Sequence, residues 1–204
     1  GTTTVTATSE ITGSSGEVET ALGAVTNGGA VNLTITSLGT IAELIAINAA
    51  TTGNIVLSQG SIVRNYSETA ADLAAAFDGI TTSTAMLTIS GTTAADVAEL
   101  KTINDATIGT VVLNAATIAA NLGGTATDLA AAFDGITTST GDLTITGTTP
   151  ATIAELMTIN AATSGNVVLN AQTIGTAYSD TAANLAAAFD GINTSTGNLS
   201  ITGT

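Results

Sequence analysis

A twelve-residue phrase occurs three times in this chain with almost no change. It reads TAADLAAAFDGI from residue 69, TATDLAAAFDGI from residue 125 and TAANLAAAFDGI from residue 181, so the copies are 56 residues apart. An active site is needed once, whereas a repeat protein builds every structural unit from its own copy of the sequence. The spacing therefore predicts a repeat architecture and argues against catalysis.

The repeated phrase has the pattern of a short helix. In the first copy Leu73, Ala76 and Phe77 are spaced so that they share one helical face. Thr69 is the predicted N-cap, and an acidic residue follows it three positions later, which is a variant of the capping box. Gly79 comes just after the last turn, where a left-handed C-cap is commonly glycine. We expect the phenylalanines of the three copies to be buried in register, at Phe77, Phe133 and Phe189.

The rest of the repeat supplies two strands and a second helix. The motif AEL(x)₂IN lies between the strands at 43–48, 99–104 and 155–160, and Pro150 is expected at the first helical position of the last of these helices. Short apolar runs, two to each repeat, predict strands near Leu33, Leu57, Leu87, Leu113, Leu143, Leu169 and Leu199. Thr4–Ala7 has the same character.

These elements predict an α/β fold, because consecutive strands joined by a helix lie parallel through right-handed crossovers. No single strand and helix can bury its apolar face alone, so we expect a repeat solenoid with one parallel β-sheet, a layer of short helices and about 56 residues per two-coil repeat. A pure β-helix is the alternative, which the helix propensity of LAAAF disfavours. The expected segments form one continuous solenoid: a divergent N-terminal coil at 1–32, repeats at 33–86, 87–142 and 143–198, and the start of a further coil at 199–204.

The charge balance excludes several classes of partner. Arg64 and Lys101 are the only basic residues, and the formal net charge is −14. Such a chain repels nucleic acid and anionic membrane surfaces. The absence of cysteine excludes disulfides and cysteine-based metal sites, and no apolar run is long enough to predict membrane insertion. Because the sequence begins at Gly1 rather than methionine, we expect a processed chain or a fragment.

The phrase DTAANL at residues 180–185, followed by an Ile/Thr strand, resembles the tandem repeats of very large secreted bacterial cell-surface proteins. The resemblance covers roughly residues 17–204. Those proteins often carry haemolysin-type calcium-binding repeats elsewhere, so the resemblance implies an extracellular or cell-surface location, a calcium-rich setting and an adhesin-like or surface-layer-like role. The chain lacks the GGxGxD nonapeptide of calcium rolls, since Gly123 and Gly124 are followed by TATD.

Two sets of acidic residues recur with the repeat and are the candidates for chemistry. Equivalent residues of stacked two-coil repeats lie about 10 Å apart, which is too far for the coupled carboxylates of a retaining glycosidase and loosely compatible with the wider pair of an inverting one. We therefore interpret the first set as exposed helix residues and predict no catalytic site and no cofactor: Glu43, Glu99 and Glu155. The second set follows the repeated helix beside a glycine turn, and its members are weak candidate ligands for calcium: Asp78, Asp134 and Asp190.

The strands also carry threonines that alternate with apolar residues, and rows of threonine on a flat sheet can match an ice lattice. Valines on the intervening strands, at Val56, Val112 and Val168, interrupt the rows. The rows are Thr34/Thr36, Thr88/Ser90, Thr144/Thr146 and Ser200/Thr202.

The sequence thus favours a non-enzymatic structural repeat segment of an extracellular protein, one that forms a rod, filament, surface-layer or adhesin scaffold by end-to-end stacking. The expected contact joins the strand at 198–202 to the N-terminal coil of the next copy. The alternative is a module that binds glycan, calcium or ice on its sheet face or coil edges.

Overall fold

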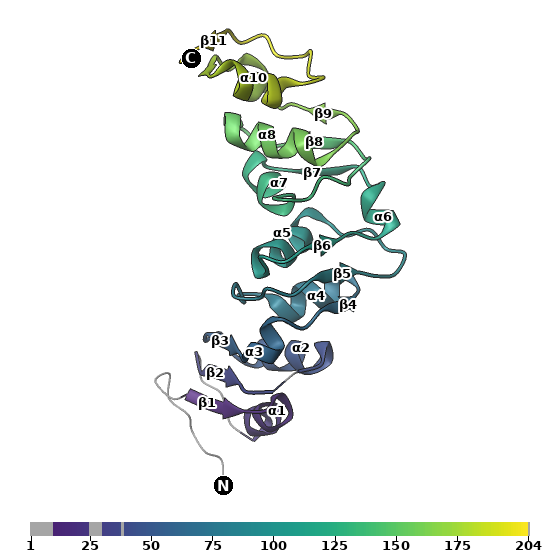
Figure 1. Ribbon diagram of the computed structural model, residues 1–204, viewed down its shortest axis with the longest axis vertical. Helices are drawn as coiled ribbons and strands as arrows, with labels where there is room; N and C mark the ends of the chain where they lie inside the picture. The colour runs from purple at the N-terminus through teal and green to yellow at the C-terminus, as the bar shows by residue number, and fades with distance from the viewer. Residues whose placement is uncertain (1–9, 25–29, 38, 204) are drawn as a thin grey trace. The chain divides into compact units, whose positions relative to one another are not determined.

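Short strands and helices alternate along the whole described chain (Figure 1). The computed structural model describes residues 10–24, 30–37 and 39–203, so the strand expected at Thr4–Ala7 lies outside it. The strands are β1 (Glu10–Gly13), β2 (Asn32–Ile35), β3 (Ile55–Leu57), β4 (Tyr66–Glu68), β5 (Leu87–Ile89), β6 (Val111–Val112), β7 (Leu122–Gly124), β8 (Leu143–Ile145), β9 (Val167–Val168), β10 (Tyr178–Asp180) and β11 (Leu199–Ile201).

The helices between these strands are short, and none of the described helices is long and apolar enough to cross a bilayer. They are α1 (Ser15–Gly23), α2 (Ile41–Ala50), α3 (Gln59–Ile62), α4 (Ala70–Phe77), α5 (Val97–Ala106), α6 (Ala115–Ile118), α7 (Ala126–Ala132), α8 (Ile153–Ala162), α9 (Ala171–Gly175) and α10 (Ala182–Phe189).

The strands form several small parallel sheets, and the expectation of one continuous sheet is wrong. The sheets have the orders β1-β2-β3, β4-β5-β6, β7-β8-β9 and β10-β11. The breaks fall where the connections are short, at 58–65, 113–121 and 169–177. A parallel crossover connection needs a dozen or more residues. These links are shorter, so the next strand cannot pair in parallel with the strand that precedes the link. A new sheet begins instead.

Each new sheet opens with a strand that the sequence patterns did not predict. These opening strands are β4, β7 and β10, and they have the sequences YSE, LGG and YSD. Each pairs in parallel with the leucine-initiated strand that follows the next helix, as Tyr66 does with Leu87 and Tyr178 does with Leu199. Each complete sheet therefore has three strands, whereas the sequence predicts two strands in each repeat.

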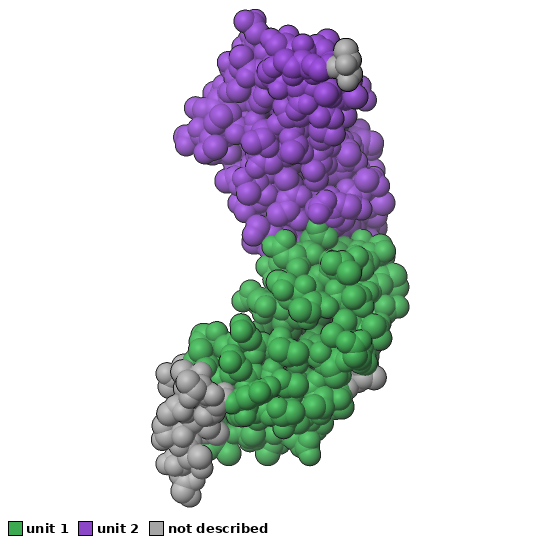
Figure 2. All heavy atoms as spheres, turned by 60° about the vertical axis from the view of Figure 1, so that its left-hand side comes forward, with its two compact units in different colours: residues 1–91, 102–112 green, residues 92–101, 113–204 purple. Residues whose placement is uncertain are grey.

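The described chain divides into two compact units (Figure 2). One contains residues 1–91 and 102–112, and the other contains residues 92–101 and 113–204. Within the first unit α2 packs against α1 and α4, and within the second α8 packs against α7 and α10. Leu44 and Leu73 are fully buried in the first unit, and Leu129 and Leu156 are fully buried in the second.

The helix starts confirm the predicted threonine N-cap. The side chain of Thr69 accepts a hydrogen bond from the Asp72 N–H, and Thr125 makes the same bond with Asp128. The placement of Pro150 is wrong, because α8 begins at Ile153. There Thr152 and the glutamate at the third helical position form a reciprocal capping box, which sets the start after the proline.

The repeated helix ends in a tight turn that explains its Phe-Asp-Gly-Ile sequence. The Ile80 N–H donates to the Phe77 carbonyl at 2.9 Å, Asp78 is extended (φ −55°, ψ 126°) and Gly79 has φ +71°. This is a type II turn, which requires the left-handed conformation that glycine adopts without strain. The prediction of a left-handed glycine is confirmed.

Burial of the repeated phenylalanines is confirmed for two of the three. Phe77 and Phe133 are inaccessible to solvent, whereas Phe189 is half-buried. Tyr66 packs edge-on against Phe77, with ring centroids 5.4 Å apart, and Tyr178 lies at the same distance from Phe189. Phe189 is more exposed because no further helix and strand of the described chain cover its face of α10.

Candidate functional site

The recurring glutamates act as helix caps. Glu43 accepts hydrogen bonds from the Thr40 N–H at 2.9 Å and from the Ser15 hydroxyl at 2.7 Å. Glu155 accepts from the Thr152 N–H at 2.7 Å and from a threonine hydroxyl of α7. The expectation that these residues are exposed is wrong, since Glu43, Glu99 and Glu155 are half-buried at the helix starts.

The electrostatics of these carboxylates suit a structural role. The Thr40 N–H and the Ser15 hydroxyl lower the pKa of Glu43. Burial opposes ionisation of Glu155, but hydrogen bonds from Thr152 and Thr127 outweigh it and lower the pKa of this group as well. A carboxylate held ionised by its donors is a poor general acid at neutral pH.

The calcium candidates Asp78, Asp134 and Asp190 are all exposed and follow the repeated helix at the type II turn. The backbone carbonyls of Asp78 and Asp190 accept hydrogen bonds from Asn48 and Asn160, at 2.9 and 3.1 Å. Among the residues that the structure describes, no three acidic side chains come together around a point that could hold a metal ion.

The threonine rows do not make a uniform face. Thr88 pairs with Ser67 on one side and Val112 on the other, and Thr144 pairs with Gly123 and Val168. These central threonines are half-buried. In these two described rows the hydroxyls therefore do not form the regular array that ice binding would need.

Sequence reasoning missed the role of the asparagine that ends AEL(x)₂IN. The amide of Asn48 in α2 donates to the carbonyls of Ala75 and Asp78, at the end of α4, at 3.0 and 2.9 Å. Asn160 in α8 does the same at the end of α10, and its bond to Ala187 is 2.9 Å long. Each amide satisfies carbonyls that a helix end leaves without partners. The recurrence of this asparagine was the signal that could have revealed the cap.

A threonine that follows the same helices has a similar role. The Thr107 hydroxyl donates to the Ala85 carbonyl at 2.7 Å and accepts from the Gly109 N–H at 2.9 Å. Thr51 and Thr163 make equivalent bonds in their own repeats. These hydroxyls join the loop after each helix to the coil before it.

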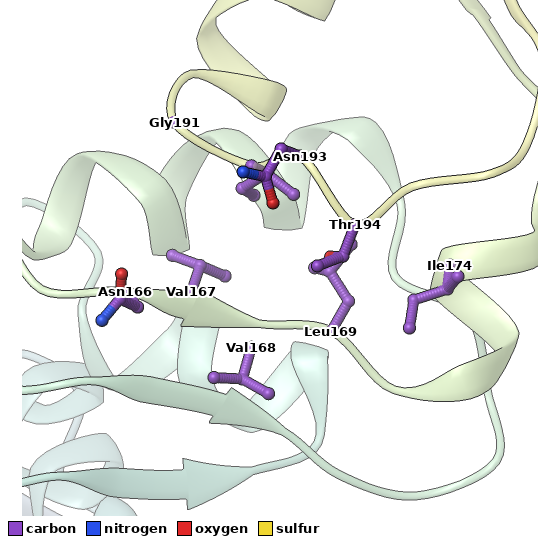
Figure 3. A pocket seen from close by; sticks show the side chains of 9 residues that line it. Asn166, Val167, Val168, Leu169, Ile174, Gly191, Asn193 and Thr194 are labelled. Carbon is purple, nitrogen blue, oxygen red and sulfur yellow. The ribbon is translucent and has the colours of Figure 1, made fainter.

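Two cavities of the second unit have mixed linings. One, of about 300 Å³, lies between β9 with the residues after it and the segment 191–194, and Figure 3 shows Asn166, Val167 and Asn193 around it. It has no titratable side chain in its lining. The other, of about 350 Å³, is lined largely by threonines at the starts of α7 and α8 together with the cap residue Glu155. In this second cavity the hydroxyls of Thr127 and Thr152 donate to Glu155 at 2.7 and 2.9 Å, and the same carboxylate caps α8.

Another cavity of the second unit is an apolar groove of about 320 Å³ that is formed by α10 and β11. We call it the C-terminal groove, and its lining is Ala182, Leu185, Ala186, Phe189, Leu199 and Ile201. Leu199 is 48% exposed and Ile201 is 68% exposed, although the equivalent Leu143 and Ile145 of the preceding repeat are 0% and 2% exposed. The groove is thus a set of core positions left open to solvent.

Comparison with protein-family models, with curated proteins and with solved structures finds no match to this chain.

Proposed function

We propose that this chain is a non-enzymatic structural repeat segment of an extracellular or cell-surface protein. Its strand–helix units continue as a solenoid, and the chain forms a rod, filament, surface-layer or adhesin scaffold through end-to-end contacts. The resemblance of DTAANL to repeats of secreted bacterial surface proteins supports the location and the class of protein.

One observation carries this proposal: asparagine, glutamate and threonine side chains that recur with the repeat bind the chain's own backbone. Asn48 and Asn160 cap the helix of the next coil, Glu43 and Glu155 cap their own helices, and Thr107 joins neighbouring coils. A binding or catalytic repeat would direct its recurring polar groups toward solvent or a cavity, because a ligand must reach them. In this chain these recurring side chains cap helices and join neighbouring coils.

The proposal is tested on the purified chain by light scattering over a range of concentrations and by negative-stain microscopy. We expect elongated assemblies that grow with concentration, and we expect Ile201→Asp to reduce them because it places a charge in the C-terminal groove. Val63→Asp is the matched control, since Val63 is 60% exposed and lies outside the groove. A monomer at every concentration would contradict assembly through the chain ends.

The alternative function, a glycan-binding module, has one supporting feature. The cavity of Figure 3 combines the polar side chains of Asn166 and Asn193 with the apolar side chains of Val167 and Ile174, and such a mixture is typical of small-molecule sites. A glycan array distinguishes the two functions. The glycan-binding alternative predicts binding that Asn193→Ala abolishes, whereas the scaffold proposal predicts no glycan binding at this cavity.

A further inference from the structure

The cavity at the starts of α7 and α8 has a lining in which oxygen is the only polar side-chain element. It has a volume of about 350 Å³ and is enclosed by residues 125–155, all within the second unit; we call it the threonine cavity. Six of its ten lining residues are threonines, and Glu155 is the one titratable side chain among the described residues that line it. A lining of hydroxyl and carboxylate oxygens accepts hydrogen bonds better than it donates them.

The Glu155 carboxylate makes this cavity negatively charged at neutral pH. Burial opposes its ionisation, but hydrogen bonds from the Thr152 N–H and from the Thr127 hydroxyl, both 2.7 Å long, outweigh burial and lower its pKa. No lysine or arginine is among the described residues that line the cavity. The carboxylate is therefore held by hydrogen-bond donors, and no cationic side chain of this lining balances its charge.

The two helix starts beside the cavity oppose a bound cation only in part. A helix N-terminus carries about +0.5 elementary charge, so α7 and α8 together contribute at most about +1. Glu155 and Asp128, whose carboxylate accepts from the Thr125 hydroxyl at 2.8 Å, carry about −2 between them when ionised. The local balance is thus negative, and the formal net charge of −14 attracts cations over longer distances.

The loop at 146–149 forms a wall of the cavity and is held in place from outside the cavity lining. The side-chain amide of Asn170 donates to the carbonyls of Gly147 and Thr149, at 3.1 and 3.0 Å. These bonds use the backbone of the loop. Thr148 and Thr149 are exposed, so their hydroxyl oxygens are available as acceptors on a preformed wall.

The volume of the threonine cavity favours an organic cation over a metal ion. Calcium takes six to eight oxygen ligands at up to about 2.6 Å, and a sphere of that radius encloses only about 70 Å³. The cavity is several times larger and has one carboxylate in its lining. It has room for a cationic group together with its carbon chain, and Pro150 supplies an apolar surface for that chain.

Two of the lining residues are specific to this repeat. Thr127 is replaced by Ala71 and Ala183 in the other two copies of the twelve-residue phrase, and Pro150 is replaced by Ala94 in the preceding repeat. The asparagines, glutamates and threonines that recur bind the backbone of the scaffold. Residues that do not recur are free to add a binding site to one repeat without changing the fold.

We propose that the threonine cavity binds a primary alkylammonium group. The ammonium donates to the Glu155 carboxylate and to the hydroxyl oxygens of Thr148 and Thr149, and the methylene chain lies on the Pro150 ring. A lysine side chain of a partner protein and a free polyamine both present this chemistry. The inference goes beyond the scaffold function, because it adds a ligand to one repeat of the scaffold.

The test is a titration of the whole chain followed by amide NMR shifts, with Nα-acetyl-lysinamide and spermidine as the probes. We expect saturable shifts at Thr148, Thr149 and Glu155, with a Kd on the order of millimolar because the ion pair is partly exposed to solvent. Glu155→Gln should weaken binding by about threefold or more. Glutamine at this position can still form the capping box, so the helix start is retained. Glu99→Gln, in the preceding repeat, is the matched control and should leave binding unchanged.

Two further variants and one analogue test the other walls of the cavity. Thr127→Ala and Pro150→Ala introduce residues that other repeats already have at these positions, and each should weaken binding. Nα-acetyl-norleucinamide has a methyl group in place of the ammonium and should not bind. Tighter binding of the lysine derivative assigns the site to a partner protein, and tighter binding of spermidine assigns it to a free polyamine.

Three results would overturn the inference. These are equal binding of the norleucine derivative, binding that Glu155→Gln leaves unchanged, and shifts at the same residues with calcium chloride but with neither amine. Light scattering without any ligand measures self-assembly separately. The scaffold function and the ammonium site can therefore fail independently of each other.

Discussion

Two separate substitutions, Phe133→Ala and Phe189→Ala, compare how much the same phenylalanine stabilises the fold in a closed core and beside the C-terminal groove. The two residues occupy the same position of the same twelve-residue phrase, but Phe133 is 1% exposed and Phe189 is half-buried at the wall of the C-terminal groove. The local sequences are LAAAF in both, so the difference between the two variants reports packing rather than helix propensity.

The expected costs differ because only one substitution creates an enclosed cavity. Phe133→Ala removes a fully buried ring and should lower the free energy of unfolding by about 3–5 kcal/mol. Phe189→Ala removes a ring that solvent already reaches, and the space it leaves is continuous with the groove. We therefore expect a loss of only about 1–2 kcal/mol, mainly from reduced burial of apolar surface.

The assay is urea unfolding followed by circular dichroism, with amide hydrogen exchange to locate the loss along the chain. Local exchange is needed because repeat proteins need not unfold in one step. Phe133→Ala should raise exchange rates in α7 and α8 most strongly. Equal losses for the two variants, or a loss below about 1 kcal/mol for Phe133→Ala, would refute the assignment of the buried helix face.

Four further substitutions test polar groups of the repeats. Asn160→Ala should cost about 1–2 kcal/mol, since it leaves carbonyls at the end of α10 without partners, and hydrogen exchange in α10 checks it. Tyr66→Phe should be neutral or stabilising because its buried hydroxyl has no partner, whereas Tyr178→Phe should cost about 1–3 kcal/mol because the Ala151 carbonyl loses a 2.7 Å bond; thermal unfolding of the pair decides this. The lowered pKa of Glu155 means that the unfolded chain binds its proton more tightly, so this contribution to stability is present above pH 4.5 and is lost as pH falls through the lower folded pKa. Glu155→Gln should therefore show a shallower loss of stability on acidification, and an unchanged slope would contradict the capping role.

The helices of the repeat could be predicted because their signals are local. The Thr69 cap, the apolar face around Leu73 and the left-handed Gly79 lie within one short stretch, and the structure has each of them. The α/β class with parallel strands followed from the alternation of strand and helix patterns.

The opening strands could not be predicted, because backbone pairing rather than side-chain pattern defines them. The run Leu122–Gly124 has two glycines and no alternation, yet it pairs with β8 as its counterparts do with their own partners. The sheet breaks were missed for the same reason, since their positions depend on where these strands lie. The Asn48 cap was visible as a recurring residue, but its partner lies 27 to 30 positions away in the sequence.

The candidate site divides in the same way. The strand at Leu199–Ile201 could be expected from the sequence, because its leucine recurs with the repeat. The shape of the groove depends on how α10 lies on β11, which only the structure shows.

The short links between sheets have a consequence for how such a gene can change length. The links at 58–65, 113–121 and 169–177 occupy equivalent places in successive repeats, and no described strand pairing crosses them from one sheet to the next. Unequal recombination between the coding sequences of two similar repeats would add or remove whole 56-residue units, and each product would still join a β3-type strand to a β4-type strand through a link of the usual kind. Copy number can then vary without cutting any sheet in two, so natural variants of this chain should differ by whole repeats while every remaining sheet keeps its register.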